Sequence, residues 1–279
     1  MPSVARWVEV HRLAVAGGEA QIARDVGDRV GRVRLATSRF GDVARLAALT
    51  LTLGQDAGAL YHLGWAKRAT GDPAAALAAY DQALSLYRAA GDRGNEAATL
   101  NNIGNVYDNL GDRQRALDYY AQALPSTRET GDRAGEAATL NNIGHVHDNL
   151  GDRQRALDYY AQALPIMRDT GDRAGEAATL NNIGAVYDSL GQRQRALDHY
   201  TQALPIRRET GDRAAEAVTR YNMAMIYRAQ GKLGQAVAEL EQVVELDRQV
   251  SHPDLQADSE MLQQVRQELA NPDHEGGSS

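Results

Sequence analysis

The sequence of 279 residues contains no cysteine, one phenylalanine and only seven prolines. Without cysteine, the chain can have no disulfide scaffold, no thiolate metal cluster and no cysteine nucleophile. Valine, isoleucine and aromatic residues are sparse, which disfavours a large β-sheet because these side chains pack best on a pleated surface. Alanine and leucine are abundant instead. The composition therefore predicts an all-α protein.

Long apolar runs are also missing from the sequence. No segment approaches the roughly 18 to 20 apolar residues of a membrane span, and the first six residues show no signal-peptide pattern. The formal net charge of −7 argues against sequence-independent binding to phosphate backbones, which requires a basic face. All basic residues except Lys67 and Lys232 are arginine, a bias that hints at a GC-rich bacterial genome. We expect a cytoplasmic protein that binds neither membrane nor nucleic acid.

The strongest pattern in the chain is an internal repeat with a period of 40 residues. Residues 91–130 and 131–170 have nearly identical sequences, and residues 171–210 form a third copy with further substitutions. The flanking segments have diverged but keep the same spacing of key residues. The predicted organisation is N-terminal helices with a degenerate repeat (1–56), five units (57–90, 91–130, 131–170, 171–210, 211–250), a C-terminal capping helix (251–270) and a disordered tail (271–279).

Each unit is predicted to form two helices. In 97–110 and in 113–129, apolar residues recur every three or four positions along one face, for example Leu100 to Leu110. The Gly111-Asp112 pair between them suits a glycine helix end followed by an aspartate cap. Pro125, inside the second helix, is expected to bend or shorten it. Because one hairpin cannot bury its apolar face alone, the units must stack.

The ends of the chain depart from the repeat. Residues 4–26 have helical spacing that is interrupted by Gly17-Gly18. The segments 28–40 and 42–53, separated by Gly41-Asp42, are predicted to form a shortened hairpin that continues the stack. Beyond Pro253, Asp254 is expected to cap a last helix of roughly 255–269.

The repeat resembles a known family in its alternation of small and large residues at Gly104, Tyr107, Gly111, Ala116, Tyr120 and Ala123. This spacing is similar to that of the tetratricopeptide repeat (TPR), and it returns five times over 57–250. The repeat is longer than the usual repeat of that family. In this it resembles the extended repeats of kinesin light chains and of Leu-Gly-Asn polarity adaptors. Its sequence is most similar to the sensor arrays of bacterial STAND signalling ATPases. Ala224 departs from the pattern, because the other units have glycine there.

The resemblance implies a right-handed α-solenoid of stacked antiparallel helix hairpins, a TPR superhelix with terminal capping helices. It also implies that the first helix of each unit lines a concave groove that holds a peptide or helix of a protein partner. The candidate partner-binding residues carried over on that basis are Tyr61, Trp65, Arg68, Asn101, Asn102, Asn105, Asp108, Asn141, Asn142, His145, Asp148, Asn181, Asn182, Ala185, Asp188, Tyr221, Asn222, Met225 and Arg228.

Asparagine dominates these positions, and its amide both donates and accepts hydrogen bonds, so a ladder of asparagines can bind the main chain of a partner segment. One column differs in every unit: Trp65, Asn105, His145, Ala185 and Met225. It reflects either drift at a tolerant site or selectivity for a partner side chain. A clamp for a C-terminal carboxylate fits badly, since alanine or valine occupies the positions expected for its lysines (Ala98, Ala138, Ala178, Val218).

The sequence offers no positive evidence of catalysis. The sole Gly-Lys pair, Gly231-Lys232, is followed by leucine and is no phosphate-binding loop. His145 and His147 are two residues apart on a helix, so they point in different directions and cannot share a metal. The aspartates at the hairpin turns and along the second helices are explained by capping and by a solvated face. We therefore expect no enzyme activity, no metal and no cofactor.

Three functions remain open at this point. The first is a stand-alone scaffold that binds a partner in its groove. The second is a regulatory sensor segment of a STAND-type ATPase, motivated by the similarity of sequence. The third is self-assembly into a homo-oligomer, because nearly identical units can stack end to end.

Overall fold

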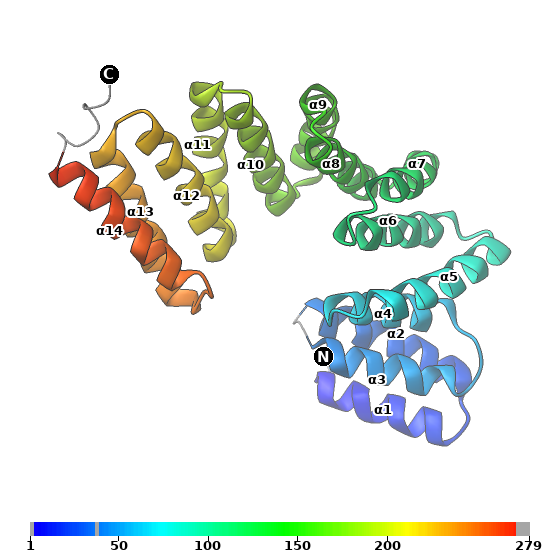
Figure 1. The fold of residues 1–279 in the computed structure, drawn as a ribbon. Helices are drawn as coiled ribbons and strands as arrows, with labels where there is room; N and C mark the ends of the chain where they lie inside the picture. Colours follow the sequence, from blue (N-terminus) through cyan, green and yellow to red (C-terminus); the bar gives the residue numbers. More distant parts are fainter. Residues whose placement is uncertain (1–2, 37–38, 272–279) are drawn as a thin grey trace. The chain divides into compact units, whose positions relative to one another are not determined.

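The computed structural model describes residues 3–36 and 39–271, and in these ranges it contains fourteen α-helices and no β-strand (Figure 1). The helices are α1 (Val4–Ala16), α2 (Ala20–Ala36), α3 (Phe40–Leu51), α4 (Ala57–Ala69), α5 (Pro73–Ala90), α6 (Arg93–Asn109), α7 (Arg113–Thr130), α8 (Arg133–Asn149), α9 (Arg153–Thr170), α10 (Arg173–Ser189), α11 (Arg193–Thr210), α12 (Arg213–Ala229), α13 (Leu233–Val250) and α14 (Leu255–Ala270). The predicted all-α class is confirmed.

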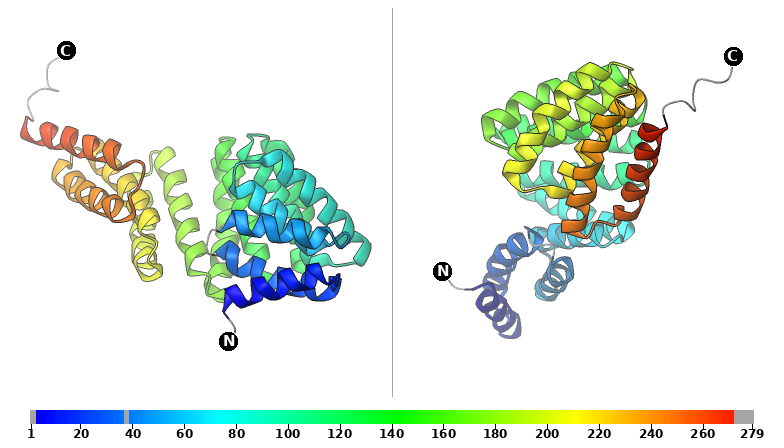
Figure 2. Two further views of the ribbon diagram at one scale, coloured as in Figure 1. Left: turned by 90° about the horizontal axis from the view of Figure 1, so that it is seen from below. Right: turned by 90° about the vertical axis from the view of Figure 1, so that its left-hand side faces the viewer.

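The helices group into two compact units, residues 1–142 and 143–279, with the boundary inside α8. Within the units, consecutive helices pack against one another from α1 to α7 and from α9 to α14, so hairpin stacks on hairpin (Figure 2). This is the α-solenoid arrangement that the repeat predicts.

The turns between helices have the expected chemistry. Gly131 ends α7 with a left-handed φ of 70°, and the side chain of Asp132 accepts a hydrogen bond of 2.9 Å from the backbone N–H of Gly135. The same glycine and aspartate roles recur at the other hairpin turns, including Gly111-Asp112. Gln192 is the exception that the sequence predicts, since its side chain makes no capping hydrogen bond to any described residue. The first helix of each repeat begins earlier than predicted, at Arg93 rather than at residue 97.

The prolines do not shorten the second helices, which is one of the two effects that the sequence predicts for them. Helix α7 contains Pro125 and has 18 residues, as do α5 and α13, which have no proline in their interior. Pro125 lies on the exposed side of α7, as does Ala121, whose carbonyl loses its helical partner to the proline. Water can reach that carbonyl, and the buried side chains of Ala123 and Thr127 hold the helix against its neighbours.

The two helices of each repeat meet at a glycine and a tyrosine. A Cβ atom placed on Gly184 would lie 2.6 Å from Cε1 of Tyr200, a distance that real Cβ atoms do not adopt. The pairs Gly64–Tyr80, Gly104–Tyr120 and Gly144–Tyr160 repeat this contact, and each of the four tyrosines is buried. In the last repeat Ala224 is compatible with the fold because Leu240, which is smaller than tyrosine, occupies the tyrosine position.

A buried glutamate joins each second helix to the following first helix. Glu176 of α10 is 4% exposed and accepts a hydrogen bond of 2.8 Å from Nε of Arg168 on α9. It also pairs with Arg173 of its own helix. Glu96, Glu136 and Glu216 repeat the contact with the preceding helix. Burial raises the pKa of Glu96, but hydrogen bonds from two arginines outweigh it and hold that pKa below its usual range. The acid is therefore charged and part of the stack.

The boundaries of the N-terminal helices differ from the predicted ones. The break at Gly17-Gly18 is present, but α2 runs without interruption from residue 20 to 36, and Gly41-Asp42 lies in the first turn of α3. The glycines of α2 are packing residues. A Cβ on Gly31 would lie 2.6 Å from Nδ1 of His62, so only glycine lets α4 come this close.

The last helix, α14, is found where the sequence predicts it, and Leu262 and Val265 are buried. Asp254 stands at its N-cap position but does not cap it as predicted, because its side chain bonds no backbone N–H among the described residues. Its own backbone has helical dihedral angles, φ −84° and ψ −1°, instead of the extended geometry that aims a cap side chain at the helix end. The predicted disordered tail lies outside the described residues from 272 onward.

Candidate functional site

All candidate partner-binding residues lie on the first helices α4, α6, α8, α10 and α12. His145 is exposed, and the side chains of the others are half-buried. These residues do form rows along consecutive first helices. Their partial burial shows that each row also takes part in packing between repeats.

Several asparagines of the predicted ladder bond to the neighbouring first helix. Nδ2 of Asn102 donates to the hydroxyl of Tyr61 at 2.8 Å, and Nδ2 of Asn142 donates to Oδ1 of Asn101 and of Asn105, at 3.3 and 3.0 Å. Thr219 donates in the same way to Asn181, at 3.1 Å. Sequence reasoning missed these bonds because it treated the face of each helix separately. Part of the ladder therefore holds first helices together.

Two charged candidates have partners within the chain. Oδ1 of Asp148 lies 3.0 Å from Nη1 of Arg153. Nε of Arg228 donates to Glu268 of α14 at 2.9 Å, so this arginine ties the last helix to α12. Both residues have a structural role that their place on the first helices did not reveal.

An open groove of about 860 Å³ lies in the N-terminal unit beside α2 and α4. Tyr61 and Trp65, both predicted to bind a partner, line it together with Tyr87 of α5. Helix α2 adds three arginines and three acidic or amide side chains, among them Arg29 and Asp25, and Asp56 adds one more carboxylate. The sequence prediction missed α2 because residues 20–36 lie outside the repeat.

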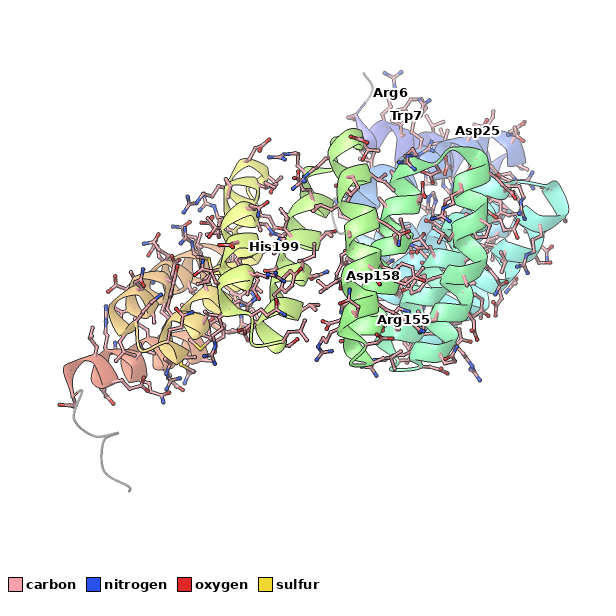
Figure 3. The ribbon with its side chains drawn as sticks, turned by 90° about the horizontal axis from the view of Figure 1, so that it is seen from above. Arg6, Trp7, Asp25, Arg155, Asp158 and His199 are labelled. Atoms are coloured by element: carbon pink, nitrogen blue, oxygen red, sulfur yellow. The ribbon has the colours of Figure 1, made fainter. Side chains whose placement is uncertain are left out.

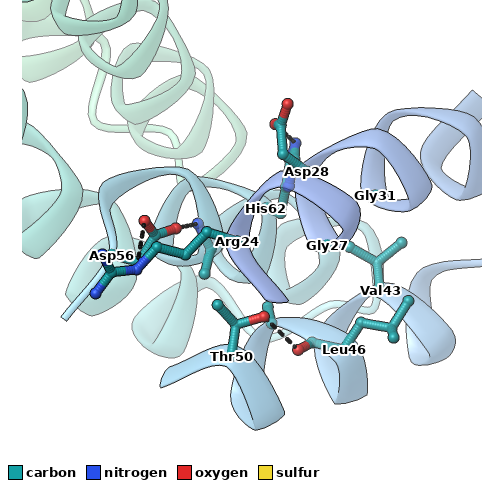
Figure 4. A pocket seen from close by; sticks show the side chains of 11 residues that line it. Arg24, Gly27, Asp28, Gly31, Val43, Leu46, Thr50, Asp56 and His62 are labelled. Carbon is teal, nitrogen blue, oxygen red and sulfur yellow. Dashed lines mark hydrogen bonds and ion pairs between the residues drawn. The ribbon is translucent and has the colours of Figure 1, made fainter. Parts of the chain in front are cut away.

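A small cavity that shares Arg24, Asp28, Asp56 and His62 with this groove is lined by polar side chains (Figure 4). Nε of Arg24 lies 3.6 Å from Asp56, and Nε2 of His62 lies 3.6 Å from Asp28. His11, which is fully buried, bonds Thr50 at 2.8 Å through Nε2. Burial lowers the pKa of both histidines, and for His62 it outweighs the opposing effect of Asp28. These neutral imidazoles are part of the core of the N-terminal unit.

A second open space of about 650 Å³ lies on the second helices of the C-terminal unit, between α9 and α11. Asp158 and His199, labelled in Figure 3, are among its lining residues. The ring of His199 stacks on Tyr187 with centroids 5.4 Å apart, and the guanidinium of Arg195 lies 5.5 Å from the centre of the same tyrosine. The ring stacking and the cation–π contact restrain these side chains. The sequence did not predict this surface.

A family model described as Tetratricopeptide repeat matches the chain four times, at residues 55–129, 95–169, 135–209 and 175–249. The chain belongs to the tetratricopeptide repeat family. Successive matches begin at residues 55, 95, 135 and 175, so their offset equals the period of the sequence. A sequence search of curated proteins finds no match.

Solved structures of other TPR proteins share the fold. BtubC (BKLC) from P. vanneervenii is 22% identical, with a TM-score of 0.61 over 90% of this chain and 93% of that one. A STAND protein with a tetratricopeptide repeat sensor from Pyrococcus horikoshii is 15% identical, with a TM-score of 0.72 over 97% of this chain and 44% of that one. A Rap protein complexed with Competence and Sporulation Factor is 16% identical, with a TM-score of 0.65 over 90% of this chain and 76% of that one.

Neither a metal centre nor a membrane-spanning helix is found among the described residues of this TPR chain. No group of three or more histidine, aspartate or glutamate side chains there could hold a metal ion, and no described helix is long and apolar enough to cross a bilayer. The two histidines of α8 point apart, as predicted. His147 is buried and stacks on Tyr159 with centroids 5.5 Å apart, whereas exposed His145 lies near Asn149.

Proposed function

We propose that the chain is a non-catalytic, cytoplasmic scaffold that binds a segment of a partner protein along its first helices. TPR proteins are in general protein-interaction scaffolds, and the observation that carries the proposal here is the groove of about 860 Å³ in the N-terminal unit. Tyr61 and Trp65, from the predicted binding face, line this groove beside the charged side chains of α2.

The lining of the groove suits a peptide. Aromatic rings offer a large rigid contact area at low entropic cost, and they are the residue type that most often dominates binding energy. The groove contains three arginines and three aspartates (Arg24, Arg29, Arg32, Asp25, Asp28 and Asp56), which favours a partner segment with charges of both signs. The hydrogen bond from Asn102 to Tyr61 and the ion pair of Arg24 with Asp56 hold three of the lining side chains in place before a partner arrives, which lowers the cost of binding.

The test is affinity capture from the source organism followed by titration of the captured partner. Trp65→Ala should weaken binding at least tenfold, because the aromatic anchors of an interface dominate its binding energy. Asp158→Asn, on the second-helix face, is the matched control and should bind as the wild type does. Circular dichroism of both variants should be unchanged. A captured partner that binds Trp65→Ala as tightly as the wild type would refute the proposed site.

The asparagine ladder calls for a separate variant. Replacing Asn101, Asn141 and Asn181 together by alanine should abolish partner binding with little loss of helicity. Binding that survives this triple change would mean that the ladder serves only the contacts between repeats.

A second candidate function is a sensor segment of a STAND-type signalling ATPase. It is supported by the TM-score of 0.72 over 97% of this chain with such a sensor, of whose protein the chain covers 44%. Sequencing the open reading frame around the chain tests this candidate. A frame that encodes no nucleotide-binding module would eliminate it.

A further inference from the structure

The open space of about 650 Å³ between α9 and α11, here called the α9–α11 groove, is a surface that the proposed scaffold function does not use. Leu157 and Leu164 line it along one face of α9. Helix α10, which packs against both second helices, adds buried Ile183 and half-buried Tyr187. Leu190, in the turn before α11, also lines the groove and is 43% exposed. The groove therefore offers apolar surface along much of its length.

Pro165 gives this groove a polar group that an ordinary helix does not expose. Proline has no backbone N–H, so the carbonyl of Ala161, four residues earlier, loses its helical donor. Ala161 and Pro165 are both exposed and both line the groove. Residues four apart lie on the same face of a helix, so the carbonyl between them is on the groove side of α9. Beside the proline ring, the groove thus contains an acceptor that can bind a donor from a ligand.

The equivalent space in the N-terminal unit has neither feature. It lies between α5 and α7, has a volume of about 370 Å³, and has Asp81 and Ser85 at the positions of the alanine and the proline. Ser85 keeps its backbone N–H, so α5 frees no comparable carbonyl. Nη2 of Arg88 also donates to Oε1 of Gln122 across this space, at 3.3 Å. The repeat alone therefore does not produce the α9–α11 groove, which depends on substitutions within the unit.

The charged side chains of the α9–α11 groove have partners within the chain. Nε of Arg168 donates to the buried glutamate of α10 at 2.8 Å, and Asp158 accepts a hydrogen bond of 3.0 Å from Gln154 on its own helix. The guanidinium of Arg195 lies 5.5 Å from the ring centre of Tyr187. The two arginines disfavour a cationic ligand, and the aspartate disfavours an anionic one. The groove therefore favours an uncharged side chain with a large apolar surface and one hydrogen-bond donor.

We propose that the α9–α11 groove binds a tryptophan side chain of a partner protein. The indole ring is the largest apolar side chain that carries a donor, and its N–H needs no donor in return. Aromatic rings pack well on proline, as in the recognition of proline-rich segments. The indole can therefore lie on the ring of Pro165 while its N–H donates to the carbonyl of Ala161. A tyrosine hydroxyl matches this site less well, because it brings an acceptor as well as a donor.

A second copy of this chain is disfavoured as the source of the tryptophan. Trp7 and Trp65 are both half-buried. The guanidinium of Arg29 lies 4.9 Å from the ring centre of Trp7, and Trp65 packs against the cluster of Val43 and Ala66. The indole therefore comes from another protein. The groove of the proposed function belongs to the N-terminal unit, so the α9–α11 groove is a second docking surface with its own test.

The test uses N-acetyl-tryptophanamide as the probe, added to the full chain with methyl groups labelled for NMR. Saturable shifts are expected at Ala161, Leu164 and Ile183. The 1-methyl derivative of the probe keeps both amides but has no indole N–H. It should bind about two- to tenfold more weakly, the range that one hydrogen bond contributes. N-acetyl-tyrosinamide should also bind more weakly than the tryptophan probe.

One variant removes the proposed acceptor without removing a core side chain. Pro165→Ala returns a backbone N–H to the carbonyl of Ala161 and takes away the proline ring. It should weaken binding of the tryptophan probe about tenfold, and it should bind the probe and its 1-methyl derivative equally. Pro205→Ala is the matched control, because it makes the same change in α11 at a residue outside the lining of the groove. It should bind the probe as the wild type does. Slower hydrogen exchange in the mutated helix should show that each variant is folded.

Three results would overturn the proposal: no saturable shifts at these methyl groups, equal binding of the two tryptophan probes by the wild type, or unchanged binding by Pro165→Ala. Shifts at Ala161 and Leu164 that grow with protein concentration alone would identify a second copy as the occupant instead. Shifts confined to the surroundings of Trp65 would place the indole in the other groove. Since the probe needs no partner, failure here leaves the capture experiment on Trp65→Ala unaffected.

Discussion

The contact between Gly184 and Tyr200 yields a sharp prediction about stability. Replacing a helical glycine by alanine normally stabilises a helix by up to about 1 kcal/mol. Here the added methyl carbon would lie 2.6 Å from Cε1 and 2.8 Å from Cδ1 of a tyrosine that is 1% exposed. The ring is part of a cluster of buried apolar side chains that includes Met223 and Ile226, so it cannot swing away without losing those contacts.

The magnitude follows from these opposing effects. Overpacking a core typically costs about 1–3 kcal/mol, and the rigid ring places this site toward the upper end. After subtraction of the helix propensity, Gly184→Ala should lower the free energy of unfolding by about 1–2 kcal/mol. Gly234→Ala is the matched control, because a Cβ there meets no described atom within 4 Å. It should be neutral or stabilising by up to about 1 kcal/mol.

The last repeat suggests the rescue. Ala224 and Leu240 occupy the equivalent positions there, and both are fully buried. Tyr200→Leu alone should destabilise by creating a cavity, but it should make Gly184→Ala harmless. The double variant should therefore be more stable than the sum of the single effects predicts, by about 1–3 kcal/mol.

The four variants and the wild type are compared by urea unfolding followed by circular dichroism, together with hydrogen exchange of α10 and α11. Hydrogen exchange is needed because repeat arrays often unfold in parts. A Gly184→Ala variant as stable as Gly234→Ala would refute the reasoning, and so would strict additivity in the double variant.

Three further outcomes are expected. Gln192→Asp should restore the missing N-cap of α11 and stabilise that helix by about 1 kcal/mol. In the wild type, hydrogen exchange should show that α11 opens before α9, and equal protection of the two helices would contradict this. Glu176→Gln should destabilise by about 1.5–3 kcal/mol in urea unfolding, because hydrogen bonds to a charged, buried group are lost; a neutral effect would show that the pair is only a surface contact. Burial lowers the pKa of His11 and His62, so the stability that depends on their neutral forms is present above about pH 6.5 and lost as pH falls. The protection factors of the amides in α1 to α4, which are corrected for the pH dependence of intrinsic exchange, should therefore fall between pH 7 and 5, and unchanged protection factors would contradict this.

The sequence determined the fold because the repeat is a local signal. Spacing of apolar residues, glycine at a left-handed turn and aspartate at a cap act within a few residues of one another, so they place helix after helix. The similarity to the tetratricopeptide repeat family rests on the same local signal, the alternation of small and large residues within each unit. Outside the repeat the prediction was weaker, and Gly41-Asp42 was wrongly taken as a break, because a single pair of turn residues does not decide a helix boundary.

Only the tertiary structure decided what each exposed position does. It showed that Asn142 bonds the preceding first helix, that Pro125 is accommodated because its side of the helix faces water, and that α2 completes the groove beside Trp65. These are relations between residues that lie far apart in the chain or on different helices. Their energies depend on burial and distance, and a repeat pattern contains neither.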